Sequence, residues 1–175
     1  MPLRMRWWLT NKTTKRLREQ NMKTKKDYKA FLEEVRKETG IDALVPDETG
    51  LVTVNVDETY NVNLQFVEAS ASILCFVEVM QLPSDAPKEV YRDLLAGGLF
   101  GHETGGGFFT LEPDTETVVY NYFFDLEAIE DDVDEFVSAL EKIMQLCDVW
   151  AKRIKGILED DEPSGSTENH IFFHP

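Results

Sequence analysis

The strongest constraint on the fold of this chain is the segment of residues 72–82, which is almost continuously apolar. Its apolar residues include Ile73, Leu74, Cys75, Phe76, Val77, Val79 and Met80. An extended chain with apolar side chains on both sides is typical of a central strand that is covered on both faces. Pro83 and Pro87 follow and end the segment, because proline has no N–H for a strand ladder. We therefore expect residues 72–82 to form the middle of a sheet.

Four further segments have the pattern of strands. Apolar and polar residues alternate at Val52, Val54 and Val56 and again at Val62, Leu64 and Phe66, with a turn near residues 57–60 between them. This period of two predicts two strands of a half-buried antiparallel sheet. Residues 107–112 and 117–126 are predicted to form a hairpin, in which Pro113 and Asp114 supply the turn.

Three amphipathic helices are predicted around these strands. Thr24 and Asp27 form a capping box before an apolar stripe, which predicts a helix over residues 25–39. The pattern of residues 88–95 predicts a helix of two or three turns, which ends at Gly97 and Gly98. A helix of this length is too short to be stable alone. Asp131 is predicted to cap a long helix that continues to about residue 159 with one sustained apolar stripe.

This order of elements predicts the α+β fold class, in the order helix, three strands, helix, two strands, helix. The expected architecture is a five-stranded twisted antiparallel sheet that is packed by the N- and C-terminal helices. Ile41, Leu44 and Val45, in the connection after the first helix, are expected to pack back onto the core. We expect a single domain over residues 24–159, a disordered basic arm over residues 1–23 and a disordered acidic and polar tail over residues 160–175.

Charge is distributed unevenly along the chain. The net charge is −15, but residues 1–26 hold nine Lys or Arg and a single acid, Glu19. The remainder holds nine bases against 32 acids, a net charge of −23. An acidic body repels phosphate backbones, so we expect no nucleic-acid partner and favour a cationic or unstructured polypeptide.

The two termini leave alternatives open. Arg4, Arg6, Trp7, Trp8 and Leu9 have the chemistry of a contact with anionic lipid, but the run is short and an unstructured extension is favoured. A start at Met1 and a start at Met22 both stay open. Ile171, Phe172 and Phe173 near the end could dock in a groove, although a disordered terminus is favoured. With no apolar run of about 18 residues and no signal-peptide core, we expect no membrane insertion and a cytoplasmic protein. Cys75 and Cys147 are expected to be buried free thiols.

The sequence offers no catalytic or metal-binding motif. His102 and Glu103 could form an acid/base pair, but adjacent residues of a loop usually point apart, so a solvated turn is favoured. The glycines of residues 97–107 fit neither a phosphate loop nor a dinucleotide turn, and a flexible connection is expected there. The acids of residues 130–135 lack the EF-hand spacing and are typical of a helix N-terminus. We expect no cofactor and no metal.

Five stretches of the chain together resemble the CesT (Tir chaperone) family of class I type III secretion chaperones. They are FLEEVRKETGI, CFVEVMQLP, YRDLLAGGLF, GGGFFTLEPDTETVVYNYFFDL and FVSALEKIMQLCDVWAKRI, and the match covers about residues 25–158. None is a strict signature alone, and the specificity lies in their order and spacing. The chain departs from the family at Ala96, Gly97 and Gly98, where a polar residue, often Asn, usually follows the two leucines.

The resemblance implies a bacterial cytoplasmic homodimer, not an enzyme, that binds the N-terminal chaperone-binding segment of one or more secreted effectors without nucleotide hydrolysis. The short helix would lie at the dimer interface, with Tyr91, Leu94, Leu95 and Leu99 as its contact residues. Candidate effector-binding residues are Phe31, Val35, Ile41, Leu44, Val52 and Val54. Taken singly, each fits the core better than a pocket, and for Phe31 and Val35 we favour packing on the sheet. A secretion-associated ATPase is a further candidate partner.

The same sequence features admit two other functions. A regulatory or adaptor protein with the same fold would bind a partner that is not secreted, and the same pattern of residues would serve it. A small hydrolase is disfavoured, because no nucleophile and base have motif support.

Overall fold

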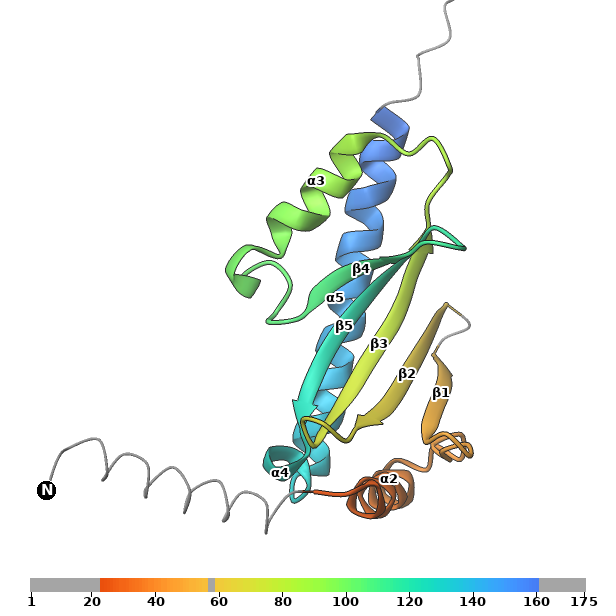
Figure 1. The fold of residues 1–175 in the computed structure, drawn as a ribbon, viewed down its shortest axis with the longest axis vertical. Helices are drawn as coiled ribbons and strands as arrows, with labels where there is room; N and C mark the ends of the chain where they lie inside the picture. The colour runs from red at the N-terminus through yellow and green to blue at the C-terminus, as the bar shows by residue number, and fades with distance from the viewer. Residues whose placement is uncertain (1–22, 57–58, 161–175) are drawn as a thin grey trace, which may run out of the picture.

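The computed structural model of the protein describes residues 23–56 and 59–160. Its elements in chain order are α2 (Lys25–Thr39), β1 (Leu51–Val56), β2 (Tyr60–Val67), β3 (Ser72–Gln81), α3 (Lys88–Gly97), the 3₁₀ turn η1 (Leu99–Gly101), β4 (Phe108–Glu112), β5 (Thr117–Asp125), α4 (Leu126–Ile129) and α5 (Val133–Asp160). The strands form one five-stranded sheet in the order β1-β2-β3-β5-β4, and every neighbouring pair is antiparallel. The predicted α+β class and the central place of β3 are confirmed (Figure 1).

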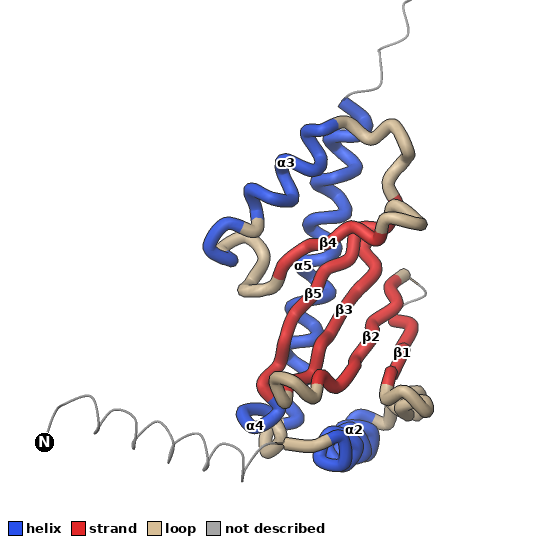
Figure 2. Tube along the Cα trace, in the orientation of Figure 1, coloured by secondary structure: helices blue, strands red, loops and turns tan. Residues whose placement is uncertain are grey.

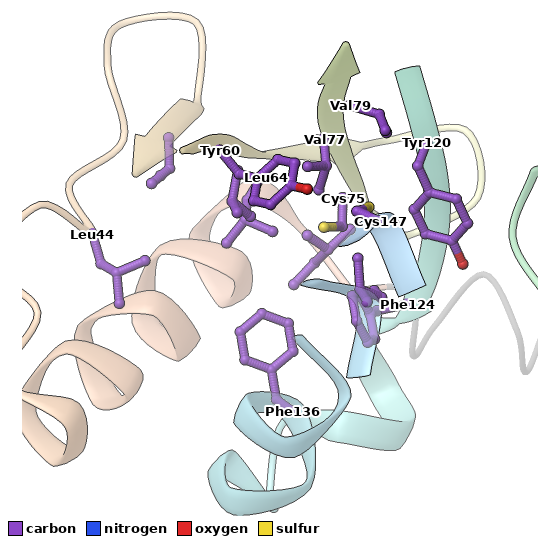
Figure 3. Packing of buried hydrophobic residues seen from close by; sticks show 14 of the residues in the cluster. Leu44, Tyr60, Leu64, Cys75, Val77, Val79, Tyr120, Phe124, Phe136 and Cys147 are labelled. Atoms are coloured by element: carbon purple, nitrogen blue, oxygen red, sulfur yellow. The ribbon is translucent and has the colours of Figure 1, made fainter. Parts of the chain in front are cut away.

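Helices α2 and α5 pack on the same face of the sheet. The hydroxyl of Tyr28 on α2 donates a hydrogen bond of 3.1 Å to the backbone oxygen of Leu64 on β2. The ring of Phe136 on α5 meets Phe31 of α2 and Phe124 of β5, with centroid distances of 5.1 and 5.0 Å. These rings join both helices and the sheet in one core (Figure 3).

No described helix covers the opposite face of the sheet, which carries Leu74, Phe76, Phe108 and Phe123 and is called the open face below (Figure 1). Along β3, Ile73, Cys75 and Val77 point to the helices and are completely buried, whereas Leu74 and Phe76 are only half-buried. The prediction that residues 72–82 are covered on both faces is therefore wrong for the described chain. A continuous apolar run does not distinguish a covered face from one that is left for a partner.

The two cysteines meet in the core. Cys75 of β3 and Cys147 of α5 are both buried free thiols (Figure 3). Burial raises the pKa of each thiol to about 12, because a thiolate is poorly solvated there.

Several predicted boundaries are corrected by capping interactions. The strand β5 ends at Asp125, whose carboxylate accepts a hydrogen bond of 3.0 Å from the N–H of Glu127 and so begins the short helix α4, which the sequence did not predict. The long helix is capped by Asp132, which accepts from the N–H of Glu135 at 2.8 Å, and not by Asp131. A run of acids allows each of them to cap, so the sequence left this position uncertain by one residue.

The glycine-rich loop before β4 is held by hydrogen bonds that the prediction of a flexible connection did not include. The buried hydroxyl of Tyr120 donates to the backbone oxygen of Thr104 at 2.7 Å, and the hydroxyl of Thr104 donates to the oxygen of Gly107 at 2.6 Å. A Cβ atom on Gly107 would lie 2.2 Å from the Tyr120 hydroxyl, so this close approach requires glycine.

The predicted arm and tail lie almost entirely outside the described residues, which include only Lys23 of the one and Asp160 of the other. Among the helices that the structure describes, none is both long enough and apolar enough to cross a membrane.

The short helix α3 packs beside the C-terminal half of α5 (Figure 2). Gly97 lies against Trp150, and a Cβ atom at this glycine would lie 2.2 Å from the indole ring. The ring has no room to move, because its Nε1 donates to the backbone oxygen of Glu103 at 3.1 Å and its face meets Phe109 with a centroid distance of 4.8 Å. Gly97 thus sets how closely the two helices approach.

We expect Gly97→Ala to lower the free energy of unfolding by about 1–3 kcal/mol, the usual cost of forcing an extra methyl group into a packed core. The matched control is Gly98→Ala, where a Cβ atom would meet its nearest neighbour at 3.5 Å and the backbone is already helical. The control should stay within about 1 kcal/mol of the parent chain. Urea unfolding followed by circular dichroism measures both variants, and equal stabilities would contradict the role of Gly97.

Candidate protein-binding surfaces

The outward side of α3 and η1 carries three exposed apolar side chains, called the α3 patch below. Leu95 is 79% exposed, Leu99 62% and Phe100 87%. The opposite side of α3 is fixed to the body of the protein, since Val90 is completely buried. The exposed side chains therefore lie on a helix that is fixed from behind and on the turn that directly follows it.

The four residues predicted for a dimer interface divide between two environments. Leu95 and Leu99 point outward in the α3 patch, whereas Tyr91 and Leu94 are half-buried against the core. Phe100 was not predicted, because the glycines beside it placed it in a connection. The only sequence feature that could have indicated its exposure is that it directly follows Leu99, a predicted interface residue.

The backbone of Phe100 adopts a left-handed conformation, with φ of 58°. This conformation costs a residue with a side chain roughly 1–2 kcal/mol, and glycine is the residue that usually occupies it. The fold therefore holds a strained backbone at Phe100, whose ring is more exposed than those of Phe108 and Phe123.

Arg153 of α5 connects α3 to the glycine-rich loop. Its guanidinium donates to Asp93 of α3 at 2.5 Å and to the carboxylate of Glu103 at 2.6 Å, and it lies 4.6 Å from the centroid of the Trp150 ring. A guanidinium can form such a fork because its donors are planar and fixed. This cluster, called the Arg153 clamp below, sets the position of α3 and of the loop together.

The Arg153 clamp also decides the role of Glu103. The carboxylate of Glu103 is paired with Arg153, while the neighbouring His102 is exposed. The structure therefore gives this carboxylate a structural ion pair. Among residues 23–56 and 59–160, no group of three or more His, Cys, Asp or Glu side chains could hold a metal ion.

A second set of apolar residues lies where α2 leads into β1. Four of the six predicted effector-binding residues are buried in the core: Phe31, Val35, Leu44 and Val52. Val54 is half-buried, and Ile41 is 41% exposed. Whether they contact an effector stays a prediction, and burial favours a core role for the first four.

The exposed part of this region consists of Ile41 and Val45, called the α2–β1 rim below. Val45 is 56% exposed, so of the three residues expected to pack back, only Leu44 does so. A hollow of about 280 Å³ opens here, with Leu32, Leu44, Val45 and Pro46 as its apolar lining and Lys29, Glu33 and Arg36 as its charged lining. The rim is thus an apolar surface beside charges of both signs.

The turn between the α2–β1 rim and β1 is held by Asp47. Its Oδ1 atom accepts from the N–H groups of Thr49, Gly50 and Leu51 at 2.8 to 2.9 Å and from the Thr49 hydroxyl at 2.7 Å. The hydrogen bond from the Thr49 side chain contributes most to holding the pKa of Asp47 below its ordinary value. This turn fixes the start of β1 relative to Val45.

Strand β1 forms one edge of the sheet and has no neighbour on its outer side among the described strands. Its sequence, LVTVNV, contains no charged residue and no proline. Proteins usually block a free edge with charged residues, proline or a bulge, because the unpaired backbone groups accept a further strand. Strand β1 contains neither charged residues nor proline, so neither device prevents a further strand from pairing with its edge.

A comparison with protein families matches the larger part of this chain. Residues 30–151 match the family described as the Tir chaperone protein (CesT) family. The comparison with curated protein sequences found no match.

Solved structures agree with the fold. A chain of the ExsC–ExsE complex matches with a TM-score of 0.66 and 17% identity, covering 76% of this chain and 97% of that one. A chain of the HopA1–SchA chaperone–effector complex matches with a TM-score of 0.57 and 20% identity, covering 75% and 95%. A chain from the structure of the Yersinia pestis type III secretion chaperone SycH in complex with a stable fragment of YscM2 matches with a TM-score of 0.51 and 21% identity. The match covers 68% of this chain and 98% of that one. At these identities the likeness shows the fold.

We expect Arg153→Gln to loosen α3. The ion pairs with the half-buried Asp93 and the exposed Glu103 contribute about 0–1 kcal/mol each and the contact with the indole about 0.5–1 kcal/mol, so amide exchange in residues 90–97 should speed up by about tenfold. Hydrogen–deuterium exchange with mass spectrometry measures this, and β3 serves as an internal reference. The control is Lys152→Gln, which removes a neighbouring exposed charge. Equal exchange in both variants would contradict the role of the Arg153 clamp.

Proposed function

Because this chain belongs to the Tir chaperone protein (CesT) family, we propose that it is a chaperone of type III secretion that binds the N-terminal segment of one or more secreted effectors. The bound segment is extended and not globular, and binding keeps it soluble and competent for secretion. The chaperone acts in the bacterial cytoplasm by passive binding, without nucleotide hydrolysis.

The observation that carries this proposal is the uncharged edge of β1 beside the exposed Ile41 and Val45. An extended client adds as a strand to β1, so that backbone hydrogen bonds supply affinity that does not depend on the client sequence. Alternate side chains of the client then reach the α2–β1 rim and the hollow behind it, which supplies selectivity. The buried Phe31, Val35, Leu44 and Val52 support this surface from beneath.

The α3 patch supports a homodimer. Leu95, Leu99 and Phe100 together expose an apolar surface on a helix that the Arg153 clamp holds in place, and such a surface is stabilised when a second copy covers it. Because the same patch lies on both copies, the contact is self-complementary around a twofold axis. A secretion-associated ATPase as a further partner remains a prediction without a specific surface.

Client binding is tested by copurification with the N-terminal segment of a secreted protein that is encoded beside this chain. We expect the double variant Ile41→Ser/Val45→Ser to weaken binding by about tenfold or more, because two apolar contacts of about 1–2 kcal/mol are lost. The matched control is Val149→Ser, which removes a 62% exposed valine of α5 that is not part of the α2–β1 rim.

Three results would speak against this function. Equal loss of binding in the control and the double variant would remove the α2–β1 rim from the mechanism. A client that is released only on addition of ATP would contradict passive binding. Capture of a partner that is not secreted would favour a regulatory or adaptor role.

The dimer is tested by light scattering of the purified chain at micromolar concentration. We expect the parent chain to have about twice the protomer mass of 20.1 kDa, and the variant Leu95→Asp/Leu99→Asp to have the mass of one protomer. Val149→Asp is the control and should leave the mass unchanged. A parent chain with a mass near 20.1 kDa would exclude the dimer, whatever the client experiment shows.

A further inference from the structure

The open face of the sheet carries a strip of aromatic and aliphatic side chains that no described element covers. Phe108 of β4 and Phe123 of β5 are stacked with a centroid distance of 6.3 Å and are 43% and 47% exposed. The strand register places Leu74 directly beside Phe123, and it places Phe76 and Phe108 on either side of Asn121. An exposed apolar strip of this extent is typical of a surface that binds something.

The charged residues of the sheet indicate what kind of segment could bind to the open face. None of the five strands contains Lys, Arg or His, and their only charged residues are Glu78, Glu112 and Asp125. The strand register places all three on the open face. Two copies of this face would bring acidic residues together, which disfavours a second copy as the occupant. A segment that combines aromatic residues with positive charge is complementary to the strip.

The beginning of the described chain lies at one end of this sheet. Lys23 forms an ion pair of 2.5 Å with Glu130, and the short helix α4 connects Glu130 to the end of β5. At the same end of the sheet, a hollow of about 380 Å³ is lined by Ser70, Ser72, Phe123 and Asp125. Lys23 therefore lies near α4, which follows the end of β5, the strand that carries the exposed ring of Phe123.

The segment before Lys23 has the chemistry that the open face requires. Residues 1–22 hold six Lys or Arg and one acid, and Trp7, Trp8 and Leu9 stand between Arg6 and Lys12. Fully extended, they reach about 70 Å, whereas a nine-residue strand is about 30 Å long. The other end of the chain is less suitable, because residues 161–175 contain three acids and no Lys or Arg.

We propose that residues 1–22 fold back onto the open face of their own chain. Trp7 and Trp8 pack on Phe123 and Phe108, and the basic residues pair with Asp125 and the acids around α4. The arm thereby covers the apolar strip that α2 and α5 leave uncovered. This proposal does not rest on client binding, since it concerns the face of the sheet and not the edge of β1.

The proposal is tested by paramagnetic relaxation in the full chain. A nitroxide is attached to Thr10→Cys under short labelling, which spares the buried Cys75 and Cys147. We expect loss of amide peak intensity at residues 74–76, 108 and 121–123, and no loss at residues 141–149 of α5. Raising the salt concentration to about 1 M should weaken the effect, because the Debye length falls to about 3 Å.

Two variants and one mixed sample decide the interpretation. Phe123→Ser should abolish the intensity loss, whereas Phe100→Ser, which removes an exposed ring from the α3 patch, should leave it unchanged. In the mixed sample, isotope-labelled chain without nitroxide is combined with unlabelled chain that carries it. Intensity loss there at the same residues would overturn the proposal in favour of the arm of a second copy. Uniform loss, or none, would overturn it as well.

Discussion

The packing of α5 on one face of the sheet is the interaction on which the rest of the structure depends. Near its start, Phe136 contacts Phe31 of α2 and Phe124 of β5. In its C-terminal half, Trp150 packs against Gly97 of α3 and Phe109 of β4. Burial of apolar surface is the dominant favourable term in folding, so a single helix that buries its stripe along the whole sheet positions α2, α3 and the glycine-rich loop at once.

Packing on one side leaves apolar surface elsewhere. It remains at the α3 patch, at the α2–β1 rim beside the free edge of β1, and on the open face. In a chain with a net charge of −15, the rest of the surface repels other copies of itself. The protein therefore concentrates its exposed apolar surface at defined places, which suits a member of a chaperone family.

The fold and the apolar surfaces followed from the sequence to different degrees. Period-two alternation located β1 and β2, and the capping box of Thr24 and Asp27 marked the start of α2. The dimer candidates Leu95 and Leu99 followed from the family resemblance and lie outward as that role requires, although the dimer itself stays a prediction. The exposure of Val45, Phe100 and Phe123 could not be predicted, because an apolar residue in a loop or strand has the same sequence pattern whether it is covered or not.

The sequence by itself determined the order of the elements, the central place of β3 and the unequal distribution of charge. These properties are local, since they depend on periodicity, capping and composition. Only the tertiary structure decided that both packing helices lie on one face, that Glu103 pairs with Arg153, and that the glycine-rich loop is held by Tyr120. Each of these depends on contacts between residues far apart in the chain, and the pattern of either partner alone does not encode which face or which atom it will meet.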